Sequence, residues 1–125
     1  MDDQMTVRSL IDEAYKTALS KGWYDGSEPN IGERLMLIVS EVAEALEEYR
    51  NGLPLTSIYT LLNGEIVPLH VKPGSKPEGF VVELADVMIR IADLAGRHNL
   101  PLEQAIQAKL VYNKTRPYRH GGKIV

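Results

Sequence analysis

The sequence contains no cysteine among its 125 residues. Disulfide bonds, zinc sites with thiolate ligands and catalysis by a thiol are therefore excluded. Histidine is scarce, and the three histidines do not have the spacing of a zinc site. The glycine motifs of P-loop and dinucleotide-binding proteins are also missing, so neither of those two nucleotide-binding classes fits the chain.

Long apolar runs and an excess of positive charge are absent too. No run approaches the roughly 18 residues of a membrane span, and the acidic start Met1–Gln4 is not followed by the apolar core of a signal peptide. A net charge of −3 gives no broad attraction to a nucleic acid polymer. We therefore expect a cytoplasmic protein without membrane or nucleic acid partners, folded as a single domain over residues 1–125.

Apolar residues recur with helical spacing in four parts of the chain. The predicted helices run from about Thr6 to Ser20, through the apolar stripe of Leu35–Tyr49 to a stop at Asn51–Gly52, from about Phe80 to Arg97, and from near Pro101 to about Thr115. The sequence thus predicts an all-α domain.

Residues 53–79 interrupt this helical pattern. Residues 57–62 and 65–71 have the composition of two short strands, and Asn63-Gly64 between them suits a type I′ turn. Pro68 must then lie at an edge or end of the strand pairing because it lacks a backbone N–H. We predict a small β-hairpin inserted between the second and third helices.

The third predicted helix is apolar around nearly its whole circumference. One narrow polar stripe remains, formed by Glu83, Asp86, Arg90 and Asp93. Such a helix must be covered on most sides, and a chain of this length offers few segments to do so. We infer that part of its surface packs against another subunit, most simply through two-fold symmetry.

Two acidic pairs are the strongest functional signal. Glu41 and Glu44 lie three residues apart in the second helix, and Glu83 and Asp86 lie three apart in the third, so each pair projects from one helix face. Four carboxylates between two packed helices need water or cations, and hard oxygen ligands favour magnesium, manganese or calcium. The simpler alternatives are a solvated face for the first pair and an Asp86–Arg90 salt bridge.

The runs Leu35–Glu48 and Glu83–Val87, together with the ending Lys109-x-x-x-Asn113-x-x-Arg116, resemble the MazG-like members of the all-α nucleoside triphosphate pyrophosphatase superfamily. The resemblance covers roughly residues 31–120 without the hairpin. It implies a bundle of four to five helices that assembles as a homodimer or homotetramer. It also implies Mg²⁺-dependent hydrolysis of a nucleoside triphosphate to the monophosphate and pyrophosphate.

The resemblance also implies roles for individual residues. Glu41, Glu44, Glu83 and Asp86 would bind Mg²⁺, or Mn²⁺ in its place, and one of these carboxylates would take a proton from the attacking water. Lys109, Asn113 and Arg116 would bind phosphate and sugar oxygens, although without the resemblance they suit an exposed basic face. Trp23 would stack on the base, although a tryptophan is more often part of the core. The tail of residues 117–125 would either fold over the phosphates or remain a mobile terminus.

The chain departs from the family pattern at Ser40, where the family motif has its first glutamate. In addition, 38 residues, positions 45 to 82, separate Glu44 from Glu83, and the hairpin accounts for the excess. A di-iron bundle is disfavoured because that class uses Glu-x-x-His motifs. In this chain the residues three positions after Glu41 and Glu83 are Glu44 and Asp86. The serious alternative is a non-catalytic oligomeric helical module that binds nucleotide or a protein partner.

Overall fold

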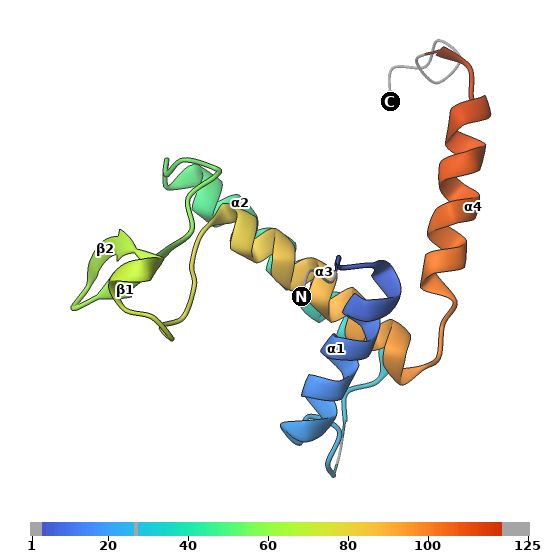
Figure 1. The fold of residues 1–125 in the computed structure, drawn as a ribbon, viewed down its shortest axis with the longest axis horizontal. Coiled ribbons are helices and arrows are strands. Elements are labelled where there is room, and N and C mark those ends of the chain that lie inside the picture. The colour runs from blue at the N-terminus through green and yellow to red at the C-terminus, as the bar shows by residue number, and fades with distance from the viewer. Residues whose placement is uncertain (1–3, 27, 119–125) are drawn as a thin grey trace.

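The computed structural model describes residues 4–26 and 28–118. This part of the chain is mainly helical and carries one small antiparallel hairpin, which confirms the predicted composition of the fold (Figure 1). The elements are α1 (Val7–Ser20), α2 (Ile31–Arg50), β1 (Tyr59–Leu62), β2 (Glu65–Pro68), the short 3-10 helix η1 (Leu69–Val71), α3 (Phe80–Arg97) and α4 (Leu102–Thr115). No helix in the described residues is both long and apolar enough to cross a membrane.

Side-chain caps fix where the first two helices begin. Thr6 and Ser9 form a reciprocal capping box at the start of α1. At the start of α2, the Asn30 side chain accepts a hydrogen bond of 2.8 Å from the backbone N–H of Glu33. Both caps satisfy backbone donors that a helix end would otherwise leave unpaired.

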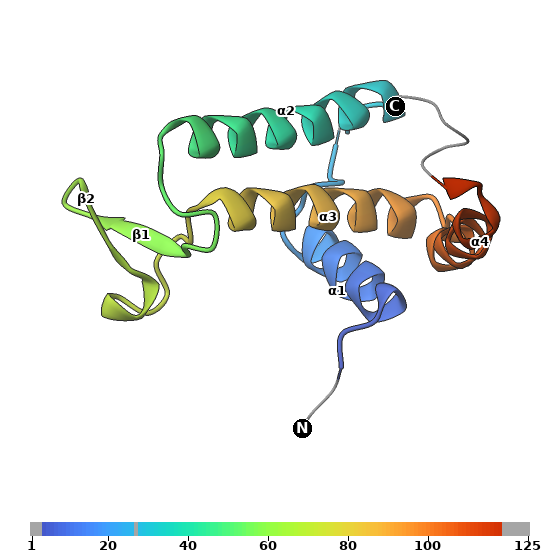
Figure 2. The same ribbon diagram turned by 90° about the horizontal axis from the view of Figure 1, so that it is seen from above.

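The central element is α3, which lies between α1 and α2. It runs antiparallel to α2, and α1 crosses its other side (Figure 2). The α1–α3 contact forms the buried core from Ile11, Ala92 and Ala95, with Val7, Leu10, Ala14 and Leu102 around them. Gly96 permits this close approach, because a Cβ atom there would lie 2.6 Å from the Cβ atom of Tyr15.

The hairpin lies beyond the C-terminal end of α2 and the N-terminal end of α3 (Figure 2). Asn63 and Gly64 both have positive φ angles, 52° and 82°, as the predicted type I′ turn requires. The pairing register joins Tyr59 to Pro68, so the proline lies at the end of the ladder, as expected. The second strand is shorter than predicted, because the chain turns into η1 after Pro68.

Apolar side chains of α2, α3 and α4 remain exposed in the described chain. The α2 stripe predicted from the sequence is exposed at Leu35, Val39, Val42, Leu46 and Tyr49, whereas Glu41 and Ala45 are buried on the same helix. Helix α4 projects away from the other helices and has no buried residue (Figure 1). Of the predicted tail, residues 119–125 lie outside the described residues.

Candidate metal centre

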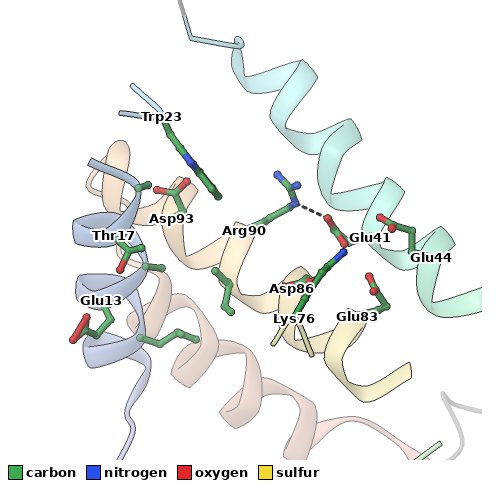
Figure 3. A pocket seen from close by; sticks show the side chains of 14 residues that line it. Glu13, Thr17, Trp23, Glu41, Glu44, Lys76, Glu83, Asp86, Arg90 and Asp93 are labelled. Atoms are coloured by element: carbon green, nitrogen blue, oxygen red, sulfur yellow. Dashed lines mark hydrogen bonds and ion pairs between the residues drawn. The ribbon is translucent and has the colours of Figure 1, made fainter. Parts of the chain in front are cut away.

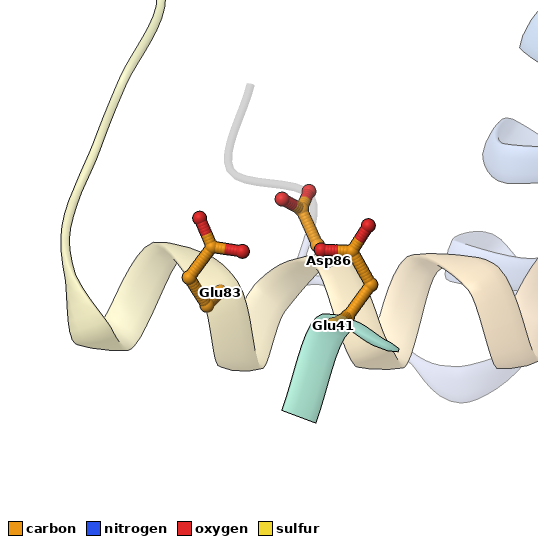
Figure 4. A group of neighbouring side chains, drawn as sticks. All are labelled: Glu41, Glu83 and Asp86. Atoms are coloured by element: carbon orange, nitrogen blue, oxygen red, sulfur yellow. The ribbon is translucent and has the colours of Figure 1, made fainter. Parts of the chain in front are cut away.

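Three of the four predicted carboxylates meet where α2 and α3 lie side by side. Glu41 comes from the middle of α2, Glu83 from the first turn of α3, and Asp86 from the next turn of α3 (Figure 4). One carboxylate oxygen from each lies within 4.8 Å of the others. The antiparallel packing of the two helices therefore creates the cluster, as the acidic spacing predicted.

Burial makes it costly for the carboxyl groups of this cluster to carry their negative charges. Only 8% of Glu41 and 9% of Glu83 is exposed, and the Oε2 atom of Glu83 is buried without a hydrogen-bond partner among the described residues. Burial, followed by the neighbouring carboxylates, raises the pKa of Glu83 to about 7. Burial and Glu41 also raise the pKa of Asp86, and nearby cations offset only part of that effect.

Glu44 lies beside the cluster rather than within it. Its side chain is exposed and lines the same cavity, and its charge contributes to the raised pKa of Glu83. It does not belong to the group of mutually close carboxylate oxygens. The structure thus separates one of the four predicted ligands from the other three.

Arg90 contacts the cluster from one turn further along α3. Its Nε atom donates a hydrogen bond of 3.0 Å to Glu41 Oε1, which links α3 to α2 (Figure 3). Among the described residues, Arg90 forms an ion pair with Glu41 and with no other carboxylate. The alternative of a plain Asp86–Arg90 salt bridge is therefore wrong.

A cavity of about 490 Å³ extends from the carboxylates towards α1. Trp23 lies near Asp93 and Thr17, at a distance from the acidic cluster (Figure 3). Its side chain is exposed and not part of the core. The full lining is Leu10, Glu13, Ala14, Thr17, Ala18, Trp23, Glu41, Glu44, Lys76, Glu83, Asp86, Ile89, Arg90 and Asp93.

The three predicted phosphate-binding residues do not line this cavity. Lys109, Asn113 and Arg116 belong to α4 and its C-terminal cap, and α4 packs only lightly against α1. Within the described chain, the cations that line the cavity are Lys76 and Arg90. Arg90 shares the polar stripe of the third helix with the acidic pair, so the sequence held a signal for it. Lys76 follows the hairpin in a loop, and no periodic pattern marks it.

Ser40 does not take part in the cluster. Its hydroxyl group donates a hydrogen bond of 2.6 Å to the backbone oxygen of Leu37, on its own helix. Ser40 is exposed and does not line the cavity. The position of the missing family glutamate therefore contributes no group to the candidate site.

A second polar network occupies the other end of the α2–α3 contact. Arg34 of α2 donates a hydrogen bond of 2.9 Å to Asp93 of α3, and both side chains are largely buried. The guanidinium of Arg34 also stacks over the ring of Tyr24, 5.0 Å from its centroid. This network holds the linker after α1 against the two helices and fixes Asp93, the last residue of the polar stripe.

The donor set of the acidic cluster suits a hard divalent cation. Three carboxylate oxygens can converge on one ion, and the unpartnered Oε2 of Glu83 offers a lone pair that the described chain leaves unused. A scan against protein-family models and searches of curated proteins and of solved structures find no match to this chain. The MazG-like resemblance therefore stays a prediction.

Proposed function

We propose that the chain is a Mg²⁺-dependent nucleoside triphosphate pyrophosphohydrolase, which releases a nucleoside monophosphate and pyrophosphate. The observation that carries this proposal is the buried, unpartnered Oε2 atom of Glu83 beside Glu41 and Asp86. Burying a carboxylate oxygen without a partner is costly, and a bound cation offsets that cost. Manganese satisfies the same oxygen ligands.

The adjoining cavity supports a ligand of nucleotide size. Its volume of about 490 Å³ lies within the range of roughly 300–1,000 Å³ typical of small-molecule sites. Carboxylates and two cations line the part near the cluster, and Trp23 offers an aromatic face elsewhere in the lining. This distribution suits a ligand with a charged end and an aromatic end.

Within this proposal, Glu41, Glu83 and Asp86 hold the cation. Magnesium, when bound, neutralises charge on phosphate oxygens and acidifies a coordinated water. Glu44 lies outside the three-oxygen group but lines the same cavity, which makes it the best candidate to accept the proton of the attacking water. Trp23 stacks on the base.

Assembly belongs to the same proposal. The accessible surface of the chain is 9631 Å², whereas a compact monomer of 13.9 kDa exposes roughly 6,700 Å². Five exposed apolar residues of α2 recur at alternating intervals of four and three, the pattern by which one helix packs along another; they are Leu35, Val39, Val42, Leu46 and Tyr49. We therefore propose a homodimer or a dimer of dimers that covers this stripe.

The assembly also offers a role for α4. A helix of 14 residues without buried side chains is marginal in water on its own. Packing against a second copy would stabilise α4 and bring Lys109, Asn113 and Arg116 within reach of a neighbouring cavity. Their predicted phosphate-binding role depends on this arrangement.

The test is pyrophosphate release from a panel of ribo-, deoxyribo- and modified nucleoside triphosphates, with magnesium or with a chelator. Glu83→Gln keeps the shape of the side chain but removes its charge, and we expect it to lower turnover by at least about a hundredfold. Glu47→Gln is the matched control, since Glu47 is exposed on α2 and does not line the cavity. That variant should turn over like the wild type.

Metal-dependent release that Glu83→Gln abolishes and Glu47→Gln preserves would support the proposal. Release that is equal in both variants would contradict the assigned site. No release from any triphosphate by a folded, magnesium-loaded protein would contradict the enzyme and favour the non-catalytic helical module.

A further inference from the structure

Arg90 forms an ion pair with Glu41, one of the carboxylates assigned to the cation. Its Nε atom lies 3.0 Å from Glu41 Oε1, and the two side chains differ in accessibility. The arginine side chain is 34% exposed, whereas that of Glu41 is 10% exposed. The guanidinium thus borders the open cavity, and the carboxylate that it contacts is covered.

Most of the hydrogen-bonding capacity of Arg90 is unused. Among the described residues, only its Nε atom donates a side-chain hydrogen bond, although a guanidinium carries five N–H groups. Arg90 also lines a second cavity of about 190 Å³, next to Arg34 and Asp93. The side chain therefore has free donors and adjoining space on two sides.

We infer that Arg90 is exchanged between Glu41 and the substrate, so that it neutralises Glu41 in the metal-free site and binds phosphate oxygens once the cation and the nucleotide have entered. This inference rests on the proposed function. The guanidinium and the cation compete for the same covered carboxylate, and two positive groups at one oxygen repel each other. A triphosphate is polyanionic and matches the planar donor fork of arginine better than one carboxylate oxygen does.

The competing explanation is a fixed ion pair that only joins the two helices. Arg34 and Asp93 provide that comparison within the same molecule, because they also link α2 to α3 at 2.9 Å. Their side chains are 13% and 7% exposed, and Arg34 does not line the larger cavity. Arg90 differs from Arg34 in being more exposed and in bordering the acidic cluster.

The exchange predicts effects of opposite sign on two affinities. Arg90→Gln removes the competing charge, so Mn²⁺ alone should bind several-fold more tightly. The same change removes a phosphate ligand, so an α,β-imido nucleoside triphosphate, added with Mn²⁺, should bind at least about tenfold more weakly. Arg90→Lys keeps the charge without the fork and should give intermediate values for both affinities.

Titration calorimetry measures both affinities on the 125-residue chain, and circular dichroism verifies the fold of each variant. Arg34→Gln is the control for the loss of an ion pair between the two helices, and it should not show the opposite shifts. A fixed role for Arg90 predicts that the two affinities weaken together or do not change, and either result would overturn the exchange. Failure of the analogue to bind the wild type would overturn it as well.

Turnover, measured separately, distinguishes this inference from the proposed function. Opposite shifts in a protein that never releases pyrophosphate would support the exchange and refute hydrolysis. Normal release by the wild type, without opposite shifts in Arg90→Gln, would refute the exchange alone.

Discussion

Among the described residues, Glu83 lacks a hydrogen-bond partner for one of its buried carboxylate oxygens. It is buried in the first turn of α3, one of its oxygens has no partner, and three other carboxylates surround it. Arg90, a cation that lines the same cavity, hydrogen-bonds to Glu41 instead. A proton or a cation must therefore complete the environment of Glu83, and this need is the physical basis of the proposed metal centre.

The raised pKa of Glu83 predicts how stability depends on pH without metal. Its pKa rises from 4.5 to about 7 on folding, mainly because of burial, so the folded state binds the proton more tightly than the unfolded chain. The free energy of unfolding should then fall as pH rises from about 4.5 to about 7. Glu83→Gln removes this loss, and we expect the variant to exceed the wild type by about 1–2 kcal/mol at pH 8.

Urea unfolding in the presence of a chelator, at pH 4 and pH 8, checks this prediction. The advantage of Glu83→Gln should be absent at pH 4, and added magnesium should reduce it at pH 8 because the ion stabilises the wild type. A variant that is less stable than the wild type at pH 8 with chelator would contradict the assigned electrostatics.

At the scale of the elements, the hairpin carries Lys76 to the cavity. The loop of residues 72–79 follows η1. It is fixed by pairing between Tyr59 and Glu78 and then enters α3 through Gly79. Gly79 has a φ angle of 134°, and a Cβ atom there would overlap the backbone oxygen of Ser57. The tight passage at Gly79 therefore fixes the path from the hairpin into the helix that carries Glu83.

A substitution at Gly79 should disturb this passage. We expect Gly79→Ala to destabilise the protein by about 2–4 kcal/mol, because it combines an unfavourable φ angle with a backbone clash. Gly74→Ala is the matched control, since Gly74 also has a positive φ angle but faces open space. Gly74→Ala should lower the free energy of unfolding by about 1 kcal/mol. Thermal unfolding measures the stability of both variants, and an equal loss of stability in the two would contradict a tight passage at Gly79.

The sequence predicted those elements that depend on local patterns. The range of α3, the Asn63-Gly64 turn and the projection of Glu83 and Asp86 from one face of α3 follow from periodicity, turn chemistry and spacing. Long-range placement was not predictable in this way. The position of Lys76 depends on how the loop of residues 72–79 packs. The pairing of Arg90 with Glu41 instead of Asp86 depends on the contact between α2 and α3.

At the scale of the whole molecule, one chain leaves much apolar surface uncovered. No large side chain among the described residues is fully buried, and the α2 stripe is exposed. The sequence could show that α2 has an apolar stripe but not which face its neighbours cover. Glu41 is buried while Leu46 is exposed, and this contrast is the observation behind the proposed assembly.

The proposed assembly predicts a solution mass of at least twice 13.9 kDa in sedimentation experiments. A charge in the stripe should oppose association, so Leu46→Glu is expected to shift the protein towards the monomer by at least about tenfold in the dissociation constant. Leu61→Glu places the same charge at an exposed apolar position of the hairpin and serves as the control. A wild-type monomer at micromolar concentration would contradict the assembly.

In the proposed metal centre, carboxylates from α2 and α3 together hold one divalent cation. Calorimetric titration of the wild type, Glu83→Gln and Glu47→Gln with Mg²⁺ at pH 8 tests it most directly. We expect one site per chain, lost or at least about tenfold weaker in Glu83→Gln and unchanged in Glu47→Gln. Equal affinity in all three proteins, or no binding by the folded wild type, would contradict it.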